Sequence, residues 1–129
     1  MKDKVPAVKN DRFAWSVGIC LTEVSPGHAK AELTIEDRHL NGLGLTHGGA
    51  IYTLADLAFA AASNSHGVNA VAVNVNMSYF KPARAGDRLT AEAEEISLSR
   101  SLGTYRITVT NQTGKTIALM QGTAFRIQQ

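Results

Sequence analysis

The residues best suited to chemistry lie in one stretch, NGLGLTHGGAIYTLADLAFAAASNSHG, which runs from Asn41 to Gly67. Its second half is rich in Ala, Leu, Ile and Phe, as expected of a helix buried on most sides, yet it contains the carboxylate of Asp56. Burying an unpaired carboxylate is strongly unfavourable or forces its pKa upward. The carboxylate is therefore either satisfied by a Ser, a backbone amide or solvent at a helix edge, or kept for chemistry.

Two glycines stand where this helix is expected to begin, within the sequence THGGA. Glycine exposes its backbone N–H to a ligand, and the first helical turn adds unpaired donors and a positive dipole end. Such donors can hold a carbonyl oxygen that becomes negative during acyl transfer. The alternative is that Gly48 and Gly49 serve only a tight turn or close packing, and that His47 is a structural hydrogen-bonding residue.

The spacing of these groups limits how they can cooperate. Asp56 lies eight residues beyond Gly48, which is about 12 Å along a helix axis. A general base must act within about 3 Å of its target or through one water. One helix therefore cannot easily supply both groups to the same bond, but two antiparallel copies can. We expect a site shared between two chains.

The residues before and within this stretch predict the first elements. Residues 1–15 are expected to form a polar arm that leads into a short helix or an irregular segment. The sequence VGICLTEVSPGHAKAELTIE predicts two strands around the turn Ser25–His28. The long helix is expected from about Gly48 to Ser65, with Gly67 just beyond its end.

The second half of the chain reads as strands joined by short turns. The alternation in AVAVNVNMSYF predicts a strand with one face made of Val71, Val73, Val75, Met77 and Tyr79. Three further strands are expected at 88–98, 104–111 and 116–127. Short reversals favour an antiparallel sheet. The sequence therefore predicts an α+β fold in a single domain, 1–129.

The predicted helix is apolar on nearly all faces, which one sheet cannot cover. At about 18 residues it would be near 27 Å long, and its uncovered side would be a large apolar patch for a monomer. We therefore expect a homodimer. Small residues that would let another element approach closely are Ala58, Ala60, Ala61 and Ala62.

Composition excludes several classes of protein. The formal net charge is +2, from 13 basic and 11 acidic residues, so no nucleic-acid partner is expected. The longest apolar stretch, Ala50 to Ala62, contains Thr53 and Asp56 and is too short to span a bilayer. The N-terminal sequence MKDKVPAVKNDRFAW mixes charges of both signs, which argues against a secretory signal and favours a cytoplasmic protein.

No metal site is expected from the sequence. The single cysteine, Cys20, provides no ligand pair and lies in an apolar run, which favours an inert core thiol. The histidines show no ligand spacing; they are His28, His39, His47 and His66.

At this point the motif resembles a known family. The stretch from Asn41 to Gly67 is similar to hotdog-fold acyl-CoA thioesterases of the phenylacetate-degradation (PaaI-like) group, and AVAVNVNMSYFKPARAGDRLTAEAE resembles the strand, Pro turn and strand that follow there. The likeness covers roughly Gly18 to Ile127. It implies one long central helix wrapped by a five- to six-stranded antiparallel sheet. It also implies homodimers with sheets joined edge to edge, often paired into tetramers.

The resemblance further implies a role for each matched residue. Asp56 would be the general base that activates water, or a nucleophile on the thioester carbon. The backbone N–H of Gly48, helped by Gly49, would polarise the carbonyl from the partner subunit. Asn41 would position the water or the substrate, and His47 would support the loop or bond near the carbonyl. No cofactor is implied, because coenzyme A is part of the substrate.

Substrate contacts are less specific. Basic residues that could meet the phosphates of coenzyme A are Lys81, Arg84, Arg88 and Arg100, with solvated surface charge as the alternative. An acyl pocket, for an aromatic acid or a medium chain, would be lined by Tyr52, Phe59, Met77, Tyr79 and Phe80. One departure is Ala72, where some relatives carry a hydroxyl residue beside the carboxylate; Asn74 is a possible substitute.

The function expected from these residues is hydrolysis of an aryl- or medium-chain acyl-CoA to a free acid and CoA. One alternative is a non-catalytic hotdog module that binds acyl-CoA as a sensor or scaffold. The other is a hotdog hydratase or dehydratase acting on enoyl or hydroxyacyl thioesters. Such enzymes generally pair a His with an acidic residue in surroundings different from His-Gly-Gly followed by a helix Asp.

Overall fold

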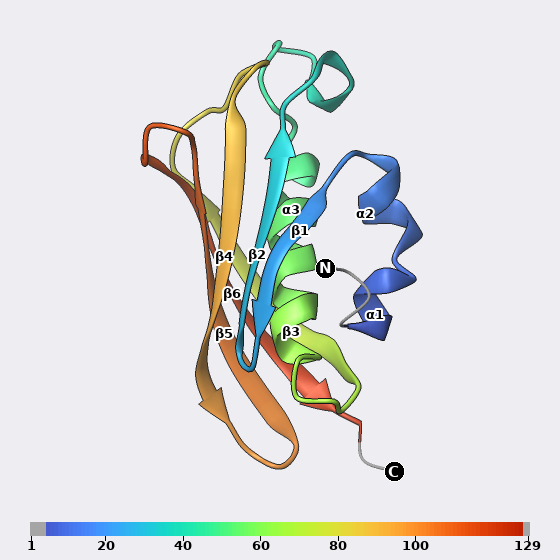
Figure 1. Ribbon diagram of the computed structural model, residues 1–129. Coiled ribbons are helices and arrows are strands. Elements are labelled where there is room, and N and C mark those ends of the chain that lie inside the picture. Colours follow the sequence, from blue (N-terminus) through green and yellow to red (C-terminus); the bar gives the residue numbers. More distant parts are fainter. Residues whose placement is uncertain (1–4, 128–129) are drawn as a thin grey trace.

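The computed structural model describes residues 5–127 of the chain. Its elements follow in the order α1 (Pro6–Lys9), α2 (Arg12–Ser16), β1 (Cys20–Ser25), β2 (His28–Thr34), η2 (Asp37–His39), α3 (Gly48–Ser63), β3 (Ala70–Tyr79), β4 (Arg88–Leu98), β5 (Leu102–Thr110) and β6 (Thr116–Arg126). The strands form one antiparallel sheet in the order β1-β2-β4-β5-β6-β3. This sheet curves around α3 (Figure 1), which confirms the α+β fold expected from the sequence.

Both ends of α3 are closed by side chains next to it in sequence. At the start, His47 is the N-cap residue and its Nδ1 accepts a hydrogen bond from the Gly49 N–H at 2.8 Å. At the end, the amide group of Asn64 donates to Ala60 O, and its oxygen accepts from Ala70 N–H. The helix ends two residues before the expected Ser65 because Asn64 already joins it to β3.

The buried face of α3 packs on the inner face of the sheet. Phe59 meets Tyr105 with 5.8 Å between ring centroids, and its ring covers Gly122, where an added Cβ would lie 2.8 Å from the ring. Only a glycine on β6 leaves room for this ring. Phe59 is therefore a core residue, and its expected place in an acyl pocket is wrong because its side chain points at the sheet.

An irregularity in the pairing of β3 with β6 divides the residues expected on one face. Val71 pairs with Phe125, whereas Val75 pairs with Gly122 on the inner face beneath α3. Directly paired residues of antiparallel strands share a face, and exposed Phe125 alternates with buried residues of β6. The expected single face is wrong because the extra residue Val73 inverts the alternation.

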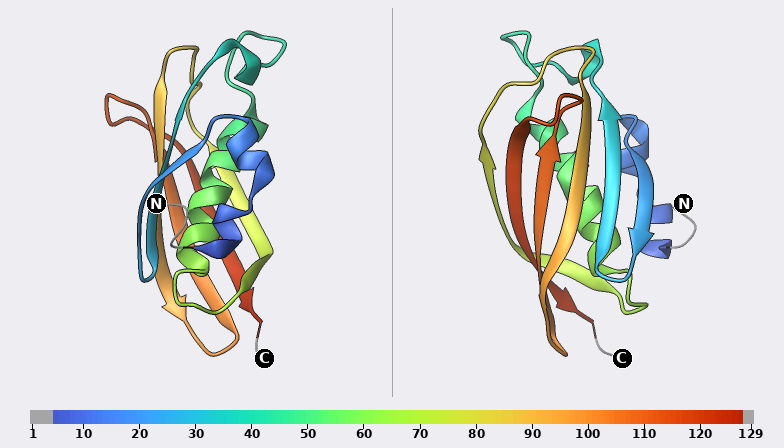
Figure 2. Two further views of the ribbon diagram at one scale, coloured as in Figure 1. Left: turned by 45° about the vertical axis from the view of Figure 1, so that its right-hand side comes forward. Right: turned by 60° about the vertical axis from the view of Figure 1, so that its left-hand side comes forward.

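The N-terminal arm covers much of α3 on the side away from the sheet. The short helices α1 and α2 lie against α3 (Figure 2, left), and Val8 and Ala14 of the arm are buried. Ala58 and Ala61 of α3 are completely buried within the single chain. A partner chain is therefore not needed to cover this part of the helix, contrary to the packing argument made from the sequence.

One exposed apolar surface lies along β3. This strand forms one edge of the sheet and β1 forms the other (Figure 2, right). Val71 is 51% exposed and Val73 is 59% exposed. An exposed apolar edge strand is a template for pairing with another chain.

Within residues 5–127, no helix has the length and apolar character needed to cross a membrane.

The contact between Gly122 and Phe59 yields a stability prediction. We expect Gly122→Ala to lower the free energy of unfolding by about 1–3 kcal/mol, because the new methyl overpacks a closed core. Gly42→Ala is the matched control, since an added Cβ there meets nothing within 4 Å. Urea unfolding of both variants would measure the difference. Equal stability would contradict the proposed packing.

Candidate active site

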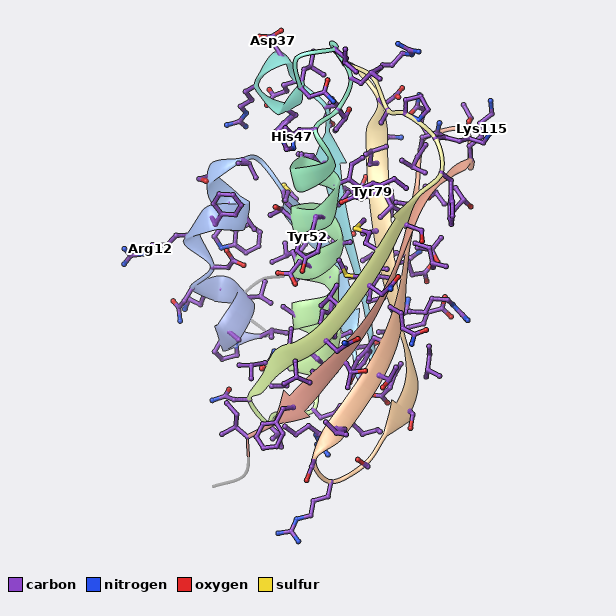
Figure 3. All side chains as sticks on the ribbon, turned by 180° about the vertical axis from the view of Figure 1, so that it is seen from behind. Arg12, Asp37, His47, Tyr52, Tyr79 and Lys115 are labelled. Carbon is purple, nitrogen blue, oxygen red and sulfur yellow. The ribbon has the colours of Figure 1, made fainter. Side chains whose placement is uncertain are left out.

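A cavity of about 300 Å³ lies between the start of α3 and the segment that follows β3. Its lining includes five residues predicted from the sequence: Asn41, Gly48, Tyr79, Phe80 and Lys81. The Tyr79 hydroxyl donates to Gly48 O at 3.0 Å, and Figure 3 shows Tyr79 beside the first turns of the helix. The fold thus brings the loop, the helix start and the end of β3 together around one space.

The first turn of α3 leaves one backbone donor available. The Gly49 N–H donates to His47 Nδ1 at 2.8 Å, and the Ala50 and Ile51 N–H groups donate to His47 O. No acceptor within residues 5–127 is paired with the Gly48 N–H. Since the dipole of α3 also makes its start positive, this N–H is well suited to a carbonyl oxygen. Gly49 is already engaged by His47.

Asn41 presents a donor to the same cavity. Its side-chain oxygen accepts hydrogen bonds from the Leu43 N–H at 2.9 Å and the Leu45 N–H at 3.2 Å. Because these bonds use the oxygen, the amide N–H groups are the part left for a ligand. Among the described residues, no acceptor is paired with that amide nitrogen.

Asp56 lies apart from this cavity. It is half-buried on α3, about 12 Å along the helix from Gly48, and no described residue donates a hydrogen bond to its carboxylate. Burial raises the pKa of Asp56, and the negative charge of Asp11 raises it further. Asp11 caps α2 by accepting from the Ala14 N–H at 3.0 Å, so the carboxylate of Asp56 is near the arm. A raised pKa in a half-buried carboxyl group is typical of a base in a catalytic site.

Ala72 and Asn74, the two residues that the sequence suggested as neighbours of the Asp56 carboxylate, lie on opposite faces of β3. Ala72 pairs with Ala124, which is buried on the inner face, and Asn74 pairs with Thr123 beyond the irregularity. Thr123 lies on the outer face of the sheet, since its neighbours in β6 point inward. Asn74 therefore lies on the face of the sheet away from α3 of its own chain.

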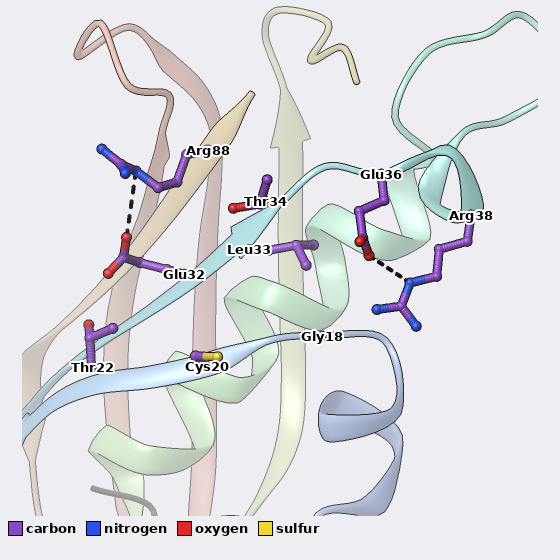
Figure 4. Close-up of a pocket in the computed structure, with 9 residues that line it drawn as sticks. All are labelled: Gly18, Cys20, Thr22, Glu32, Leu33, Thr34, Glu36, Arg38 and Arg88. Carbon is purple, nitrogen blue, oxygen red and sulfur yellow. Dashed lines mark hydrogen bonds and ion pairs between the residues drawn. The ribbon is translucent and has the colours of Figure 1, made fainter. Parts of the chain in front are cut away.

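The basic residues expected near coenzyme A are divided. Lys81 lines the cavity, whereas Arg84 is not part of the lining. The backbone N–H of Arg84 donates to the Asp87 carboxylate in the turn before β4. Arg88 pairs with Glu32 at 3.8 Å in a separate depression of about 380 Å³ on the outer edge of β1 and β2 (Figure 4). That depression also contains Cys20, which is exposed rather than a core thiol as expected from the sequence.

A second cavity, of about 470 Å³, lies on the other side of the start of α3. Its lining combines the arm, η2 and the helix: Phe13, Val17, Arg38, His39, Leu40, His47, Gly49, Ala50, Tyr52 and Thr53. The expected acyl-pocket residues are thus divided between two cavities, with Tyr52 here and Tyr79 in the first cavity. The arm's part in this cavity was missed. Its sequence signal is the apolar run Phe13–Trp15 inside a charged segment.

Metal ligands do not gather in the described part of the chain. Within residues 5–127, no three His, Cys, Asp or Glu side chains lie close enough to hold a metal ion. Two of the histidines pair with carboxylates instead: His28 with Glu92 and His66 with Glu95, each at 2.7 Å.

Comparison with known protein families shows to which family the chain belongs. The model of the Thioesterase superfamily matches residues 43–118, which hold the helix start, Asp56 and most of the sheet. The chain belongs to the thioesterase superfamily. This match, together with the relatives described next, confirms the resemblance, the hotdog fold and the enzyme class expected from the sequence, an acyl-CoA thioesterase.

Relatives within the superfamily match over nearly the whole chain. Acyl-coenzyme A thioesterase PaaI of Escherichia coli K12 is 40% identical over 119 residues, which cover 92% of this chain and 85% of that protein. The solved TT0310 protein of Thermus thermophilus is 44% identical with a TM-score of 0.88, covering 92% of this chain and 99% of that one. The Streptococcus mutans protein smu.793, solved bound to acetyl CoA, is 29% identical with a TM-score of 0.82, covering 85% and 89%.

The surroundings of Asp56 in this thioesterase lead to a prediction about its pKa. Asp11→Asn should lower the pKa of Asp56, because it removes a negative charge while Asn still caps α2. Asp37→Asn, on η2, is the control and should leave it unchanged. NMR titration of the side-chain carboxyl carbon of Asp56 would measure its pKa in both variants.

The raised pKa of Asp56 also determines whether its carboxylate stabilises or destabilises the fold. A folded-state pKa above the unfolded value stabilises the fold below the unfolded pKa, and this contribution is lost as the pH rises through the folded pKa. Asp56→Asn should therefore be more stable than the natural protein at neutral pH, and the advantage should shrink in acid. For the preceding prediction, an unchanged pKa of Asp56 in the Asp11→Asn variant would contradict the proximity of the Asp11 and Asp56 carboxylates.

Proposed function

We propose that this thioesterase hydrolyses acyl-CoA thioesters, aryl or medium-chain, to a free acid and coenzyme A. The observation that carries the proposal is the Gly48 N–H at the start of α3, which is unpaired within the described residues and belongs to a residue that lines a cavity together with Asn41 and Lys81. The naming of the E. coli relative and the acetyl CoA bound to the S. mutans neighbour support the same substrate class.

The first role of the protein is to polarise the thioester. Its carbonyl oxygen accepts hydrogen bonds from the Gly48 N–H and the Asn41 amide. Both donors stabilise the negative charge that develops when the carbonyl carbon is attacked, and the dipole of α3 adds to them. His47 keeps the arrangement in place by capping the helix and engaging the neighbouring Gly49 N–H.

The second role is to supply the attacking group. Asp56 of a second chain removes a proton from water as the water oxygen bonds to the carbonyl carbon. The tetrahedral intermediate then collapses, the C–S bond breaks, and the protonated carboxyl returns its proton to the thiolate of coenzyme A. In the alternative route the carboxylate itself attacks the carbonyl carbon, the C–S bond breaks to release the thiolate of coenzyme A, and water then hydrolyses the resulting anhydride to the free acid and the carboxylate.

This mechanism needs a homodimer, and β3 is the edge proposed to form it. Two copies related by a two-fold axis would pair their β3 strands antiparallel and join the sheets. The exposed Val71 and Val73 would then be covered. The two α3 helices would run antiparallel, which brings the start of one beside the middle of the other. Pairing of such dimers into tetramers remains a prediction from the resemblance.

The remaining expectations accompany this proposal. Lys81 is the basic residue best placed to meet a phosphate of coenzyme A, because it lines the cavity, whereas Arg84 is not part of that lining and Arg88 lines a separate depression. Hydrolysis without a metal or bound organic cofactor, and a cytoplasmic location, stay predictions from the sequence.

Removing the Gly48 N–H tests the oxyanion role. Proline is favoured at the first helical position, and His47 has φ −61° and ψ 134°, which suits a residue before proline. Gly48→Pro should therefore fold, yet lower kcat about 100- to 1,000-fold. Gly48→Ala keeps the N–H, and its methyl would lie 3.4 Å from the Tyr79 ring. Release of thiol from acyl-CoA should show that the Ala variant keeps most activity; equal loss in both would sink the role.

Mixing two inactive variants tests the shared site. Homodimers of Asp56→Asn should lose about 100-fold or more in kcat, as should homodimers of Gly48→Pro. In random heterodimers, one of the two sites has both natural groups, so an equal co-expressed mixture should recover about a quarter of the natural activity. Each variant carries its own affinity tag, so that heterodimers can be isolated. Isolated heterodimers with no activity would exclude a two-chain site.

A further inference from the structure

The second cavity described above, here called the arm cavity, follows the least buried stripe of α3. Gly49, Tyr52, Thr53 and Asp56 have the spacing of residues on one helix face, and each is exposed or half-buried. The arm lies over this stripe, with Phe13 and Val17 in the cavity wall. The lining of the arm cavity also includes His47 and Gly49, the two neighbours of Gly48 in the chain, so the cavity adjoins the residue with the unpaired N–H.

Four polar side chains in the wall already make hydrogen bonds within the chain: Arg38, His39, His47 and Thr53. The Thr53 hydroxyl donates to Gly49 O at 2.7 Å. His39 Nδ1 accepts from the Glu36 N–H at 2.9 Å, and its Nε2 lies 2.7 Å from Val17 O. What an occupant meets is mainly apolar: Phe13, Val17, Leu40, Ala50 and Tyr52.

The wall formed by the arm is held in place. Arg38 donates to Ser16 O at 3.0 Å, and the His39 ring bonds to Val17 O, so two residues of η2 hold the end of the arm. Phe13 is nevertheless 65% exposed and Tyr52 is 39% exposed. Two aromatic side chains from separate elements thus stand exposed at the edge of one apolar space. Figure 3 shows Tyr52 on α3 between the arm and β3.

Resting on the proposed function, we infer that the arm cavity receives the acyl group, and that Phe13 and Tyr52 select flat aryl groups over linear chains. At about 470 Å³, the cavity is within the usual range for small-molecule sites. The first cavity suits the polar pantetheine arm of coenzyme A better, because its wall contains the Asn41 amide and Lys81.

Aromatic selection follows from the chemistry of the two side chains. An aryl ring placed between them can pack edge-to-face or offset, which is worth about 0.5–1.5 kcal/mol beyond the area that it buries. A linear chain gains only the burial of its surface. Removal of one aromatic wall should therefore weaken aryl substrates more than linear ones.

The test compares kcat/KM for an arylacetyl-CoA and a linear eight-carbon acyl-CoA. Phe13→Ala should lower the ratio of aryl to linear kcat/KM about 2- to 12-fold, the range that one lost aromatic contact predicts. Tyr52→Ala should shift it in the same direction. Arg12→Ala is the matched control on α2, because Arg12 is exposed, lies outside the cavity lining and points away from the protein (Figure 3); it should leave the ratio unchanged.

Three results would overturn the inference. An unchanged ratio in active Phe13→Ala and Tyr52→Ala enzymes would reject the arm cavity alone, while thioester hydrolysis stands. A change in oligomeric state on size exclusion, without a change in the ratio, would make Phe13 an interface residue that a second copy covers. A folded natural protein with no turnover of either substrate would reject the proposed function and this inference with it.

Discussion

The rigid geometry of one helix, α3, is the constraint on which the proposed site depends. Each residue of α3 advances about 1.5 Å, so the N–H of Gly48 and the carboxylate of Asp56 are held about 12 Å apart along its axis. A helix is too stiff to close that separation, because doing so would break its hydrogen-bond ladder. In the proposed mechanism a single chain therefore supplies one group to each of two sites, and the chemistry needs a second chain. The unpaired apolar edge at β3 is where that chain would bind.

The fold holds α3 firmly at the end away from these two groups. Beyond the helix, His66 lies 2.7 Å from Glu95, which also accepts a hydrogen bond from the buried Tyr105 at 2.7 Å. Burial opposes ionisation of Glu95, but the hydrogen bonds from Tyr105 and His66 prevail and lower its pKa. Burial and the Glu95 carboxylate raise the pKa of Tyr105. This cluster joins the helix end to β4 and β5, while the start of α3 stays open to solvent.

The open start of α3 divides the surroundings of the Gly48 N–H into two spaces of different character. On the side of β3, Asn41 and Lys81 give the wall polar groups. On the side of the arm, His39 and Thr53 are bonded to the protein and the wall is mainly apolar. A thioester joins a polar carrier to an apolar acyl group, and its carbonyl lies at their junction. The helix start lies at the junction of the two cavities in the same way.

The sequence by itself determined the elements and the chemical motif. The strands expected at 88–98 and 104–111, and the Asn, His-Gly-Gly and Asp spacing, follow from local patterns that depend only on helix and strand geometry. Only the tertiary structure decided that the arm covers α3, that Phe59 turns to Gly122, and that Val73 inverts the faces of β3. These features arise from contacts between segments far apart in the chain, where packing against a distant partner outweighs local preference.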